Sequence, residues 1–173
     1  KPMKLPALRR ELTADATVAA GDVITFPFAS DTPVDRGWGR EILDMRGMDT
    51  SRIKAGAVPL LFNHDWNQPV GMVEDGYVGR DGRGYAKAKW FSHDDARKVR
   101  SMVEGGLRNV SFGYRVDEFE DAGDGDYIAR RFEPHEISIV TVPADIAVGM
   151  GRSEDGEVKE VRVIRAASGK ADD

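Results

Sequence analysis

The chain has 173 residues, and its 25 lysines and arginines against 30 aspartates and glutamates give a formal charge of −5. This length fits one domain that can bury a core without crosslinks, while the absence of cysteine excludes disulfide frameworks, thiol nucleophiles and cysteine-bound zinc. The net negative charge argues against binding through the phosphates of nucleic acid, so we expect no direct nucleic-acid partner.

No run of residues approaches the roughly 18 consecutive apolar positions that a membrane helix needs. The basic start, Lys1–Lys4, is also not followed by the apolar region of a signal peptide. We therefore expect an intracellular protein without a membrane partner.

Short alternating runs bounded by glycine, proline and aspartate predict a mainly β domain with a few helices, in the α+β class. In chain order the predicted strands are Asp22–Ala29, Val58–His64, Val70–Val78, Gly84–Trp90, Asn109–Phe119, Tyr127–Arg131, Glu136–Val142 and Val158–Arg165. Residues 79–84 supply turn residues between the third and fourth of these strands, which predicts a β-hairpin.

One helix is predicted between Ser92, a suitable N-cap, and the glycine pair at positions 105 and 106. Its apolar stripe consists of Ala96, Val99, Met102 and Val103. The stripe predicts that this helix packs one face against the sheet.

Two further segments are predicted to be irregular. The acidic segment Glu118–Asp126 lacks the ligand spacing of a calcium loop and is predicted to be a solvated turn. From Gly151 onward charged and small residues dominate. We therefore predict one domain over residues 1–150 and a flexible C-terminal segment over residues 151–173.

The first candidate site residue is Ser111. Alternation along its strand puts Phe112 and Tyr114 on the core face, and Ser111 with Gly113 on the other face. Because Gly113 has no side chain, another backbone, such as a substrate strand, could approach beside Ser111. Taken alone, the segment is more typical of a surface serine beside a bulge glycine. It is not a nucleophile elbow, because Asn109 replaces the first glycine and a strand follows.

The second candidate is His64, at the end of a short apolar strand. Imidazole is the usual base for a serine hydroxyl, because its ordinary pKa near 6.5 lets it accept and return a proton around neutrality. Taken alone, this position is more typical of a strand-end histidine bound by a loop carbonyl. His93 lies next to the predicted helix cap and is expected to be exposed to solvent.

The third candidate is Glu136, in the most apolar strand of the chain. Alternation places Glu136 with Ser138 and Val140 on one face and His135 on the other, so Glu136 and His135 cannot point into the same pocket. A carboxylate entering a buried strand needs a partner, either a histidine that it orients or one of the many arginines.

Together these three segments resemble the prohead proteases of tailed phages, which are capsid maturation serine proteases distantly related to the herpesvirus assemblins. The matching stretches are Val58–Asp65 followed by Pro69–Gly71, then Gly106–Tyr114, then Glu136–Ala144. Each stretch is unspecific alone, but their order is specific, and the resemblance covers about residues 26–147.

The resemblance implies a serine endopeptidase on a small, closed or nearly closed antiparallel β-barrel flanked by helices, as in assemblins. Ser111 would be the nucleophile, His64 the general base and Glu136 the acid that orients His64, while Gly113 would contribute to substrate binding. Assemblins have a second histidine in the third position, and Glu136 is chosen here for its position in the motif. The family implies no cofactor and no metal.

The resemblance also implies a role in a phage or prophage. The substrates would be the major capsid protein, a scaffold protein and the chain itself, inside the immature capsid as it assembles in the bacterial host cytoplasm. A homodimer is a further expectation, because related assemblins act as dimers. We predict that the small-residue stretch Arg165–Gly169 is an autoprocessing or linker region.

Two other functions compete with this interpretation. A non-catalytic protein that binds capsid or scaffold would keep the same barrel without the activity. A metal-dependent hydrolase could use His64 and Asp65 with His93, Asp94 and Asp95 as ligands, although no motif fixes their spacing.

Overall fold

Most of the chain folds onto one long β-hairpin. The computed structural model describes residues 2–15, 17–142 and 157–166. Its strands are β1 (Met3–Leu5), β2 (Leu8–Thr13), β3 (Val18–Ala20), β4 (Val23–Ala29), β5 (Val34–Asp35), β6 (Arg40–Leu43), β7 (Pro59–Phe62), β8 (Pro69–Val78), β9 (Gly84–Trp90), β10 (Asn109–Gly123), β11 (Asp126–Ile139) and β12 (Lys159–Arg165). Its helices are η1 (Met45–Gly47), α1 (Ser51–Lys54) and α2 (Asp94–Glu104).

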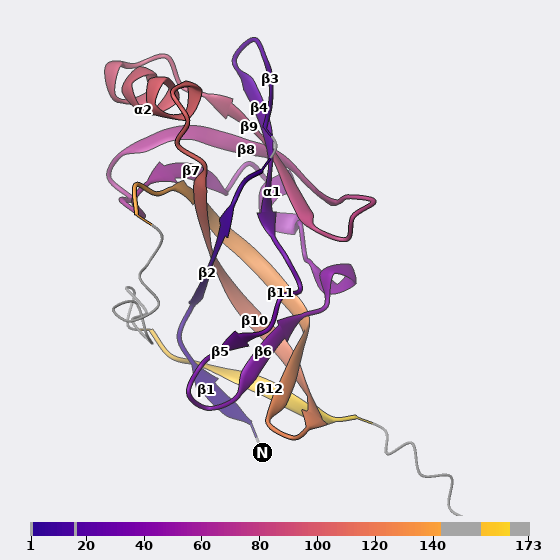
Figure 1. The fold of residues 1–173 in the computed structure, drawn as a ribbon. Coiled ribbons are helices and arrows are strands. Elements are labelled where there is room, and N and C mark those ends of the chain that lie inside the picture. The colour runs from indigo at the N-terminus through magenta and orange to yellow at the C-terminus, as the bar shows by residue number, and fades with distance from the viewer. Residues whose placement is uncertain (1, 16, 143–156, 167–173) are drawn as a thin grey trace, which may run out of the picture.

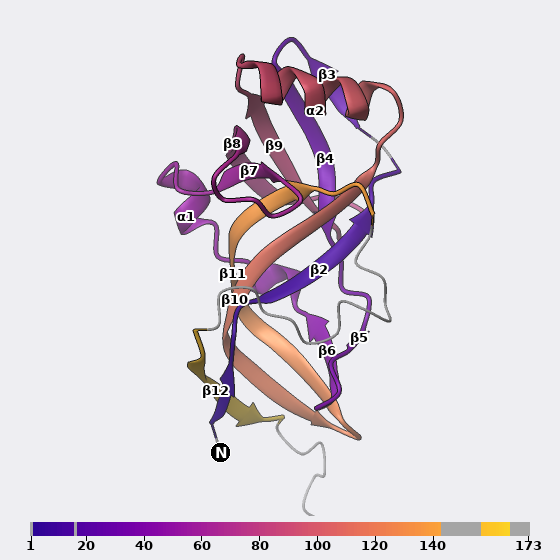
Figure 2. The ribbon, with the colours of Figure 1, turned by 90° about the vertical axis from the view of Figure 1, so that its left-hand side faces the viewer.

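The β10–β11 hairpin runs from the lower end of the molecule in Figure 1 up to the level of β7. The hydrogen-bonded path through the sheet is β1–β12–β10–β11–β7–β8–β9–β4–β3, and β2 pairs with β10, β6 with β11 and β5 with β6. One half of the hairpin therefore carries β2, β7, β8, β9 and β4, and the other half carries β1, β12, β6 and β5 (Figure 2).

The mainly β class is confirmed, but the closed antiparallel arrangement is not. Within the described residues the path ends at β3, and β2 lies close to β4 without a ladder between them. Three pairs, β7–β11, β6–β11 and β10–β12, are parallel. The sheet is thus open and mixed, and the expected barrel stays a prediction.

Small residues of β9 and aromatic residues of β4 and β10 belong to one hydrophobic core. In β9, Gly84, Ala86, Ala88 and Trp90 face inward, as the period of an extended strand requires. From β4 and β10, the rings of Phe28 and Phe112 meet edge to face, with centroids 5.0 Å apart. Phe112 follows Ser111 on β10, so these rings lie on the opposite face of the strand from the Ser111 side chain.

The predicted helix is α2, with two corrections. Its N-cap is His93, whose ring accepts the N–H of Ala96 at 3.1 Å, and not Ser92. Val99 and Val103 are buried, but Met102 lies outside the apolar stripe and is 36% exposed. The helix packs on β8 and β9. No helix of the described residues is long and apolar enough to cross a membrane.

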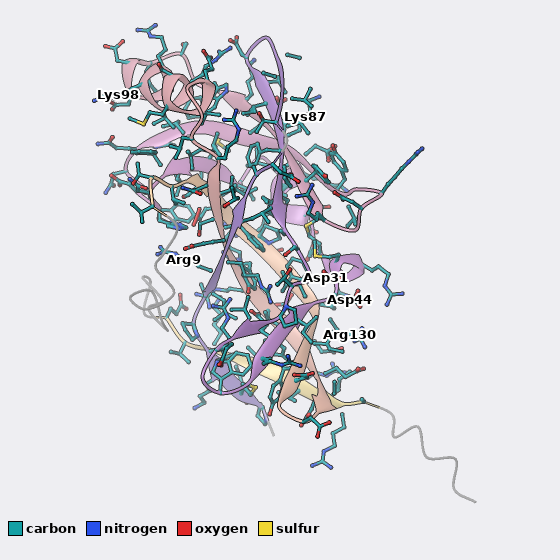
Figure 3. All side chains as sticks on the ribbon, in the orientation of Figure 1. Arg9, Asp31, Asp44, Lys87, Lys98 and Arg130 are labelled. Carbon is teal, nitrogen blue, oxygen red and sulfur yellow. The ribbon has the colours of Figure 1, made fainter. Side chains whose placement is uncertain are left out.

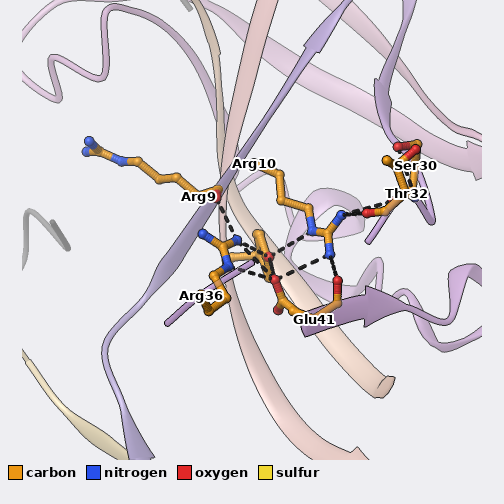
Figure 4. Close-up of polar contacts among 7 residues, drawn as sticks. Arg9, Arg10, Ser30, Thr32, Arg36 and Glu41 are labelled. Atoms are coloured by element: carbon orange, nitrogen blue, oxygen red, sulfur yellow. Dashed lines mark hydrogen bonds and ion pairs between the residues drawn. The ribbon is translucent and has the colours of Figure 1, made fainter. Parts of the chain in front are cut away.

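A buried ionic network joins β2, β6 and β10. The Tyr114 hydroxyl donates to a Glu41 carboxylate oxygen at 2.6 Å and accepts hydrogen bonds from Arg10 at 3.1 Å and Arg36 at 2.9 Å. Arg10 also donates to the carbonyls of Glu41 and Thr32, both at 2.6 Å (Figure 4). Burial, with the charge of Glu41 second, raises the pKa of Tyr114, so its hydroxyl stays protonated and donates.

The predicted acidic turn is shorter than expected, because only residues 124 and 125 form the turn and Glu120 belongs to a strand with a partly buried ion pair. β10 continues to Gly123, and its Glu120 pairs with Arg130 at 2.7 Å. Arg130 on β11 in turn pairs with Asp44, which follows β6, at 2.9 Å, and both residues are labelled in Figure 3. Glu120 thus lies in a paired strand, where Arg130 of β11 balances its charge.

Part of the C-terminal segment forms a strand. Residues 159–165 form β12, which pairs with β1 on one side and with β10 on the other. Residues 151–156 and 167–173, which include most of the predicted processing stretch, lie outside the described residues. The division at residue 150 stays a prediction.

Candidate active site

Three adjacent strands bring the candidate residues together. β10 and β11 pair so that Ser111 lies opposite Ser138 and Gly113 lies opposite Glu136. β7 runs parallel to β11 on its other side, with Leu61 beside Ser138. His64 follows β7 by two residues, so it comes just after the end of the strand that lies beside β11.

A left-handed turn directs His64 over these strands. Asn63 and His64 have φ angles of 51° and 60°, which non-glycine residues seldom adopt. The Asn63 N–H donates to the carbonyl of Ile139 at 2.9 Å, and its side-chain oxygen accepts the N–H of Thr141 at 3.0 Å. These contacts with the end of β11 hold the turn.

The side chains form one hydrogen-bonded chain. Nε2 of His64 lies 2.9 Å from Oγ of Ser111, and Nδ1 of His64 is hydrogen-bonded to Oε1 of Glu136. An ionised carboxylate only accepts, so Nδ1 carries the proton and the lone pair of Nε2 faces the Ser111 hydroxyl. This geometry suits removal of the hydroxyl proton by the imidazole.

Burial separates the site from water. Ser111 and Ser138 have no exposed surface, and Glu136 is also buried. The side chain of His64 retains 13% exposure. A peptide can therefore reach the Ser111 hydroxyl only when neighbouring atoms move aside.

The surroundings of Gly113 differ from the predicted open space for a substrate strand. A Cβ atom on this residue would lie 3.1 Å from Oε1 and 3.3 Å from Cγ of Glu136. Both of its strand edges are also paired, with Glu136 on one side and Arg9 on the other. The space beside Gly113 thus accommodates the Glu136 carboxylate, and this packing lends no support to the predicted substrate strand there.

The other two histidines take no part in this chain of contacts. His93 is exposed, as predicted, and its ring nitrogens contact the Pro69 carbonyl and the Ala96 N–H. His135 pairs with Glu133 at 3.3 Å. His64 is also hydrogen-bonded through both ring nitrogens, so the ligand set of the competing metal hydrolase is not assembled. No three histidine, aspartate or glutamate residues of the described chain are grouped to hold a metal ion.

Sequence reasoning missed two residues of the site. Alternation puts Ser138 on the same face as Glu136 but predicts no role for it. In the structure, the Ser138 hydroxyl donates a hydrogen bond to Oε2 of Glu136 at 2.9 Å. Asn63 was not singled out, although asparagine tolerates the left-handed region better than most residues. Among the described residues, the Glu136 carboxylate contacts His64 and Ser138 and no arginine.

Residues 13–153 match the model of the caudovirus prohead serine protease family. The chain belongs to this family. In a 144-residue alignment that covers 78% of this chain, it is 37% identical to the major capsid protein of Halomonas phage phiHAP-1. That match covers 24% of the relative, so the chain spans about a quarter of the curated relative that it matches.

The fold has a counterpart among solved structures. The bacteriophage T4 capsid assembly protease, gp21, is similar with a TM-score of 0.60, over 80% of this chain and 98% of that one. The sequence identity is 14%, so the likeness concerns the fold. The mainly β fold of this chain is therefore shared with a capsid assembly protease, while the closed, assemblin-like barrel stays a prediction.

Proposed function

We propose that this member of the prohead protease family is a serine endopeptidase of capsid maturation. Ser111 is the nucleophile, His64 the general base and Glu136 the acid that orients His64. The observation that supports this assignment is the 2.9 Å contact from Nε2 of His64 to Oγ of Ser111, with Glu136 on the opposite ring nitrogen.

The reaction follows from this arrangement. Ser111 Oγ attacks the peptide carbonyl carbon while its proton passes to Nε2 of His64, and Glu136 stabilises the resulting imidazolium. The imidazolium then gives the proton to the leaving amine, so that the peptide C–N bond breaks and an acyl-serine remains. A water molecule, deprotonated by His64, hydrolyses this ester and restores Ser111.

The proposed substrates are capsid proteins. The T4 neighbour is named a capsid assembly protease, and the Halomonas phage relative is named a major capsid protein. We infer from these names that the chain cuts the major capsid protein or its scaffold, and itself, inside the immature capsid in the bacterial cytoplasm. Homodimer formation stays a prediction.

Cleavage of the cognate capsid protein by matched variants tests this proposal. We expect Ser111→Ala and His64→Ala to lower the cleavage rate by about 10⁴-fold or more, and Glu136→Gln by about 10³- to 10⁴-fold. Ser101→Ala, which changes an exposed serine of α2, should cleave at the wild-type rate.

Two results would contradict the proposal. Unchanged processing in Ser111→Ala and His64→Ala would instead establish a non-catalytic capsid-binding protein. Loss of cleavage with a chelator, together with continued cleavage by Ser111→Ala, would establish a metal-dependent hydrolase.

A further inference from the structure

The hydroxyl of Ser138 connects the backbone of His64 to the carboxylate of Glu136. Oγ of Ser138 accepts the backbone N–H of His64 at 3.1 Å and donates its proton to Oε2 of Glu136 at 2.9 Å. Nδ1 of His64 occupies the other oxygen of the same carboxylate. The histidine is therefore attached to Glu136 twice, once through its ring and once through Ser138.

The local backbone explains why a side chain is needed here. β7 runs parallel to β11 only as far as Phe62 beside Ile139, and the chain then turns at Asn63. The turn removes the N–H of His64 from the ladder, and the Ser138 hydroxyl accepts it instead. A buried N–H without an acceptor is costly, so Ser138 also stabilises the left-handed conformation that directs the ring toward Ser111.

We propose that Ser138 is a positioning residue of the site. It holds the His64 backbone and the Glu136 carboxylate in one fixed relation, so that Nδ1 and Nε2 meet Glu136 and Ser111 together. This inference rests on the proposed function, because it concerns how the base of that reaction is oriented.

A pair of substitutions of nearly equal shape separates the hydroxyl from side-chain volume. Ser138→Thr keeps the hydroxyl, whereas Ser138→Val replaces it by a methyl group. The first readout is the rate at which a fluorophosphonate labels Ser111, measured across pH, which needs no knowledge of the natural substrate. The second readout is the NMR signal of the His64 Nδ1 proton, which does not depend on activity.

We expect Ser138→Thr to keep the wild-type pH profile and the strongly deshielded Nδ1 proton. Ser138→Val should be labelled about 10- to 100-fold more slowly, with a displaced pH midpoint and without that proton signal. Circular dichroism and thermal unfolding check that both variants are folded.

Three outcomes are decisive. Wild-type labelling, pH midpoint and Nδ1 proton in Ser138→Val would overturn the inference. Equal loss in Ser138→Thr and Ser138→Val would also overturn it, because shape and not the hydroxyl would then control the site. If the wild type itself is unlabelled, the proposed function fails, and loss of the Nδ1 proton in Ser138→Val alone would still establish the positioning role.

Discussion

In this site, Gly113 limits where the side chain of Glu136 can lie. A side chain there would lie against Oε1, Cγ and Cδ of Glu136 at 3.1 to 3.4 Å, within the range where a neighbour has to give way. The affected neighbour is the carboxylate that contacts His64. The glycine thus sets where the acid of the site can lie.

Gly113→Ala should therefore impair the reaction more than the fold. We expect overpacking to cost about 1–3 kcal/mol of unfolding free energy, while displacement of Glu136 lowers the rate of Ser111 labelling by about 100-fold. Denaturant unfolding and fluorophosphonate labelling measure the two effects.

A double substitution provides the control for Gly113→Ala. Glu136→Asp shortens the acid, so combining it with Gly113→Ala should cost less than the two single effects added together. Additive losses would show that Gly113 acts elsewhere.

The sequence identified Ser111, His64 and Glu136 because their motifs occur in a specific order. The finer geometry of the site depends on a β-bulge, which alternation cannot reveal. Between Gly113 and Tyr114, the partner on β11 changes from Glu136 to Pro134, so His135 is an extra, bulged residue. A strict alternation of side chains assumes a strand without a bulge, so it fails at His135. Alternation was reliable for Glu136 and Ser138 because both lie on the same side of it.

At the scale of elements, the β8–β9 hairpin is the one that the sequence predicted best. Its turn residues contact one another: Asp81 accepts hydrogen bonds from the Tyr85 hydroxyl at 2.6 Å and from Nε of Arg83 at 2.8 Å. The Tyr85 hydroxyl first, and Arg83 second, lower the pKa of Asp81 to about 2. The ordinary pKa in an unfolded chain is about 3.9.

This depressed pKa predicts an acid-sensitive turn. Because the folded value lies below the unfolded one, the contacts stabilise the hairpin fully above about pH 4 and are lost as the pH falls toward 2. An NMR titration of the Asp81 carboxyl carbon should give a midpoint near 2, and Tyr85→Phe should raise it. Tyr77→Phe, which alters the ring stacked on Tyr85, should leave it in place. An unchanged midpoint in Tyr85→Phe would contradict this origin of the shift.

β2 and β6 were missed by sequence reasoning for a common physical reason. Arg10 in β2 and Glu41 in β6 are charged residues at buried positions, with 6% and 0% exposure. A pattern based on hydrophobicity treats such positions as exposed, so neither strand shows alternation. Their burial depends on partners far along the chain, because Arg10 contacts Glu41 and Tyr114, which lie 31 and 104 residues away, and no local pattern reveals such contacts.

The same network predicts a large difference between two neighbouring residues of β6. Glu41→Gln should lower the unfolding free energy by about 3–5 kcal/mol, because the buried Arg10 and the partly buried Arg36 lose their counter-charge. Arg40→Gln breaks an ion pair with Asp126 in which the arginine is 57% exposed, and should cost about 0–1 kcal/mol. Urea unfolding of both variants measures this difference, and equal losses would show that the buried network is not stabilising.

At the scale of the whole molecule, the C-terminal strand is fixed far from the proposed nucleophile. β12 lies between β1 and β10, and the Ala166 N–H donates to the carbonyl of Asp121 at 3.0 Å. Asp121 and Ser111 belong to the same strand, β10. At about 3.3 Å per residue, a separation of ten positions spans roughly 30 Å along that strand.

This separation predicts that self-cleavage at the Arg165–Ala166 bond requires a second copy of the chain. While β12 stays paired, the bond cannot reach Ser111 of its own chain, so the rate constant per molecule should rise in proportion to protein concentration. Wild-type protein should also cut added Ser111→Ala protein at the same bond, as mass spectrometry of the products can show. Val161→Asp, which places a charge at a buried position of β12, should release the strand and make cleavage independent of concentration. A concentration-independent rate in the wild type would show that β12 detaches on its own and that the chain cuts itself.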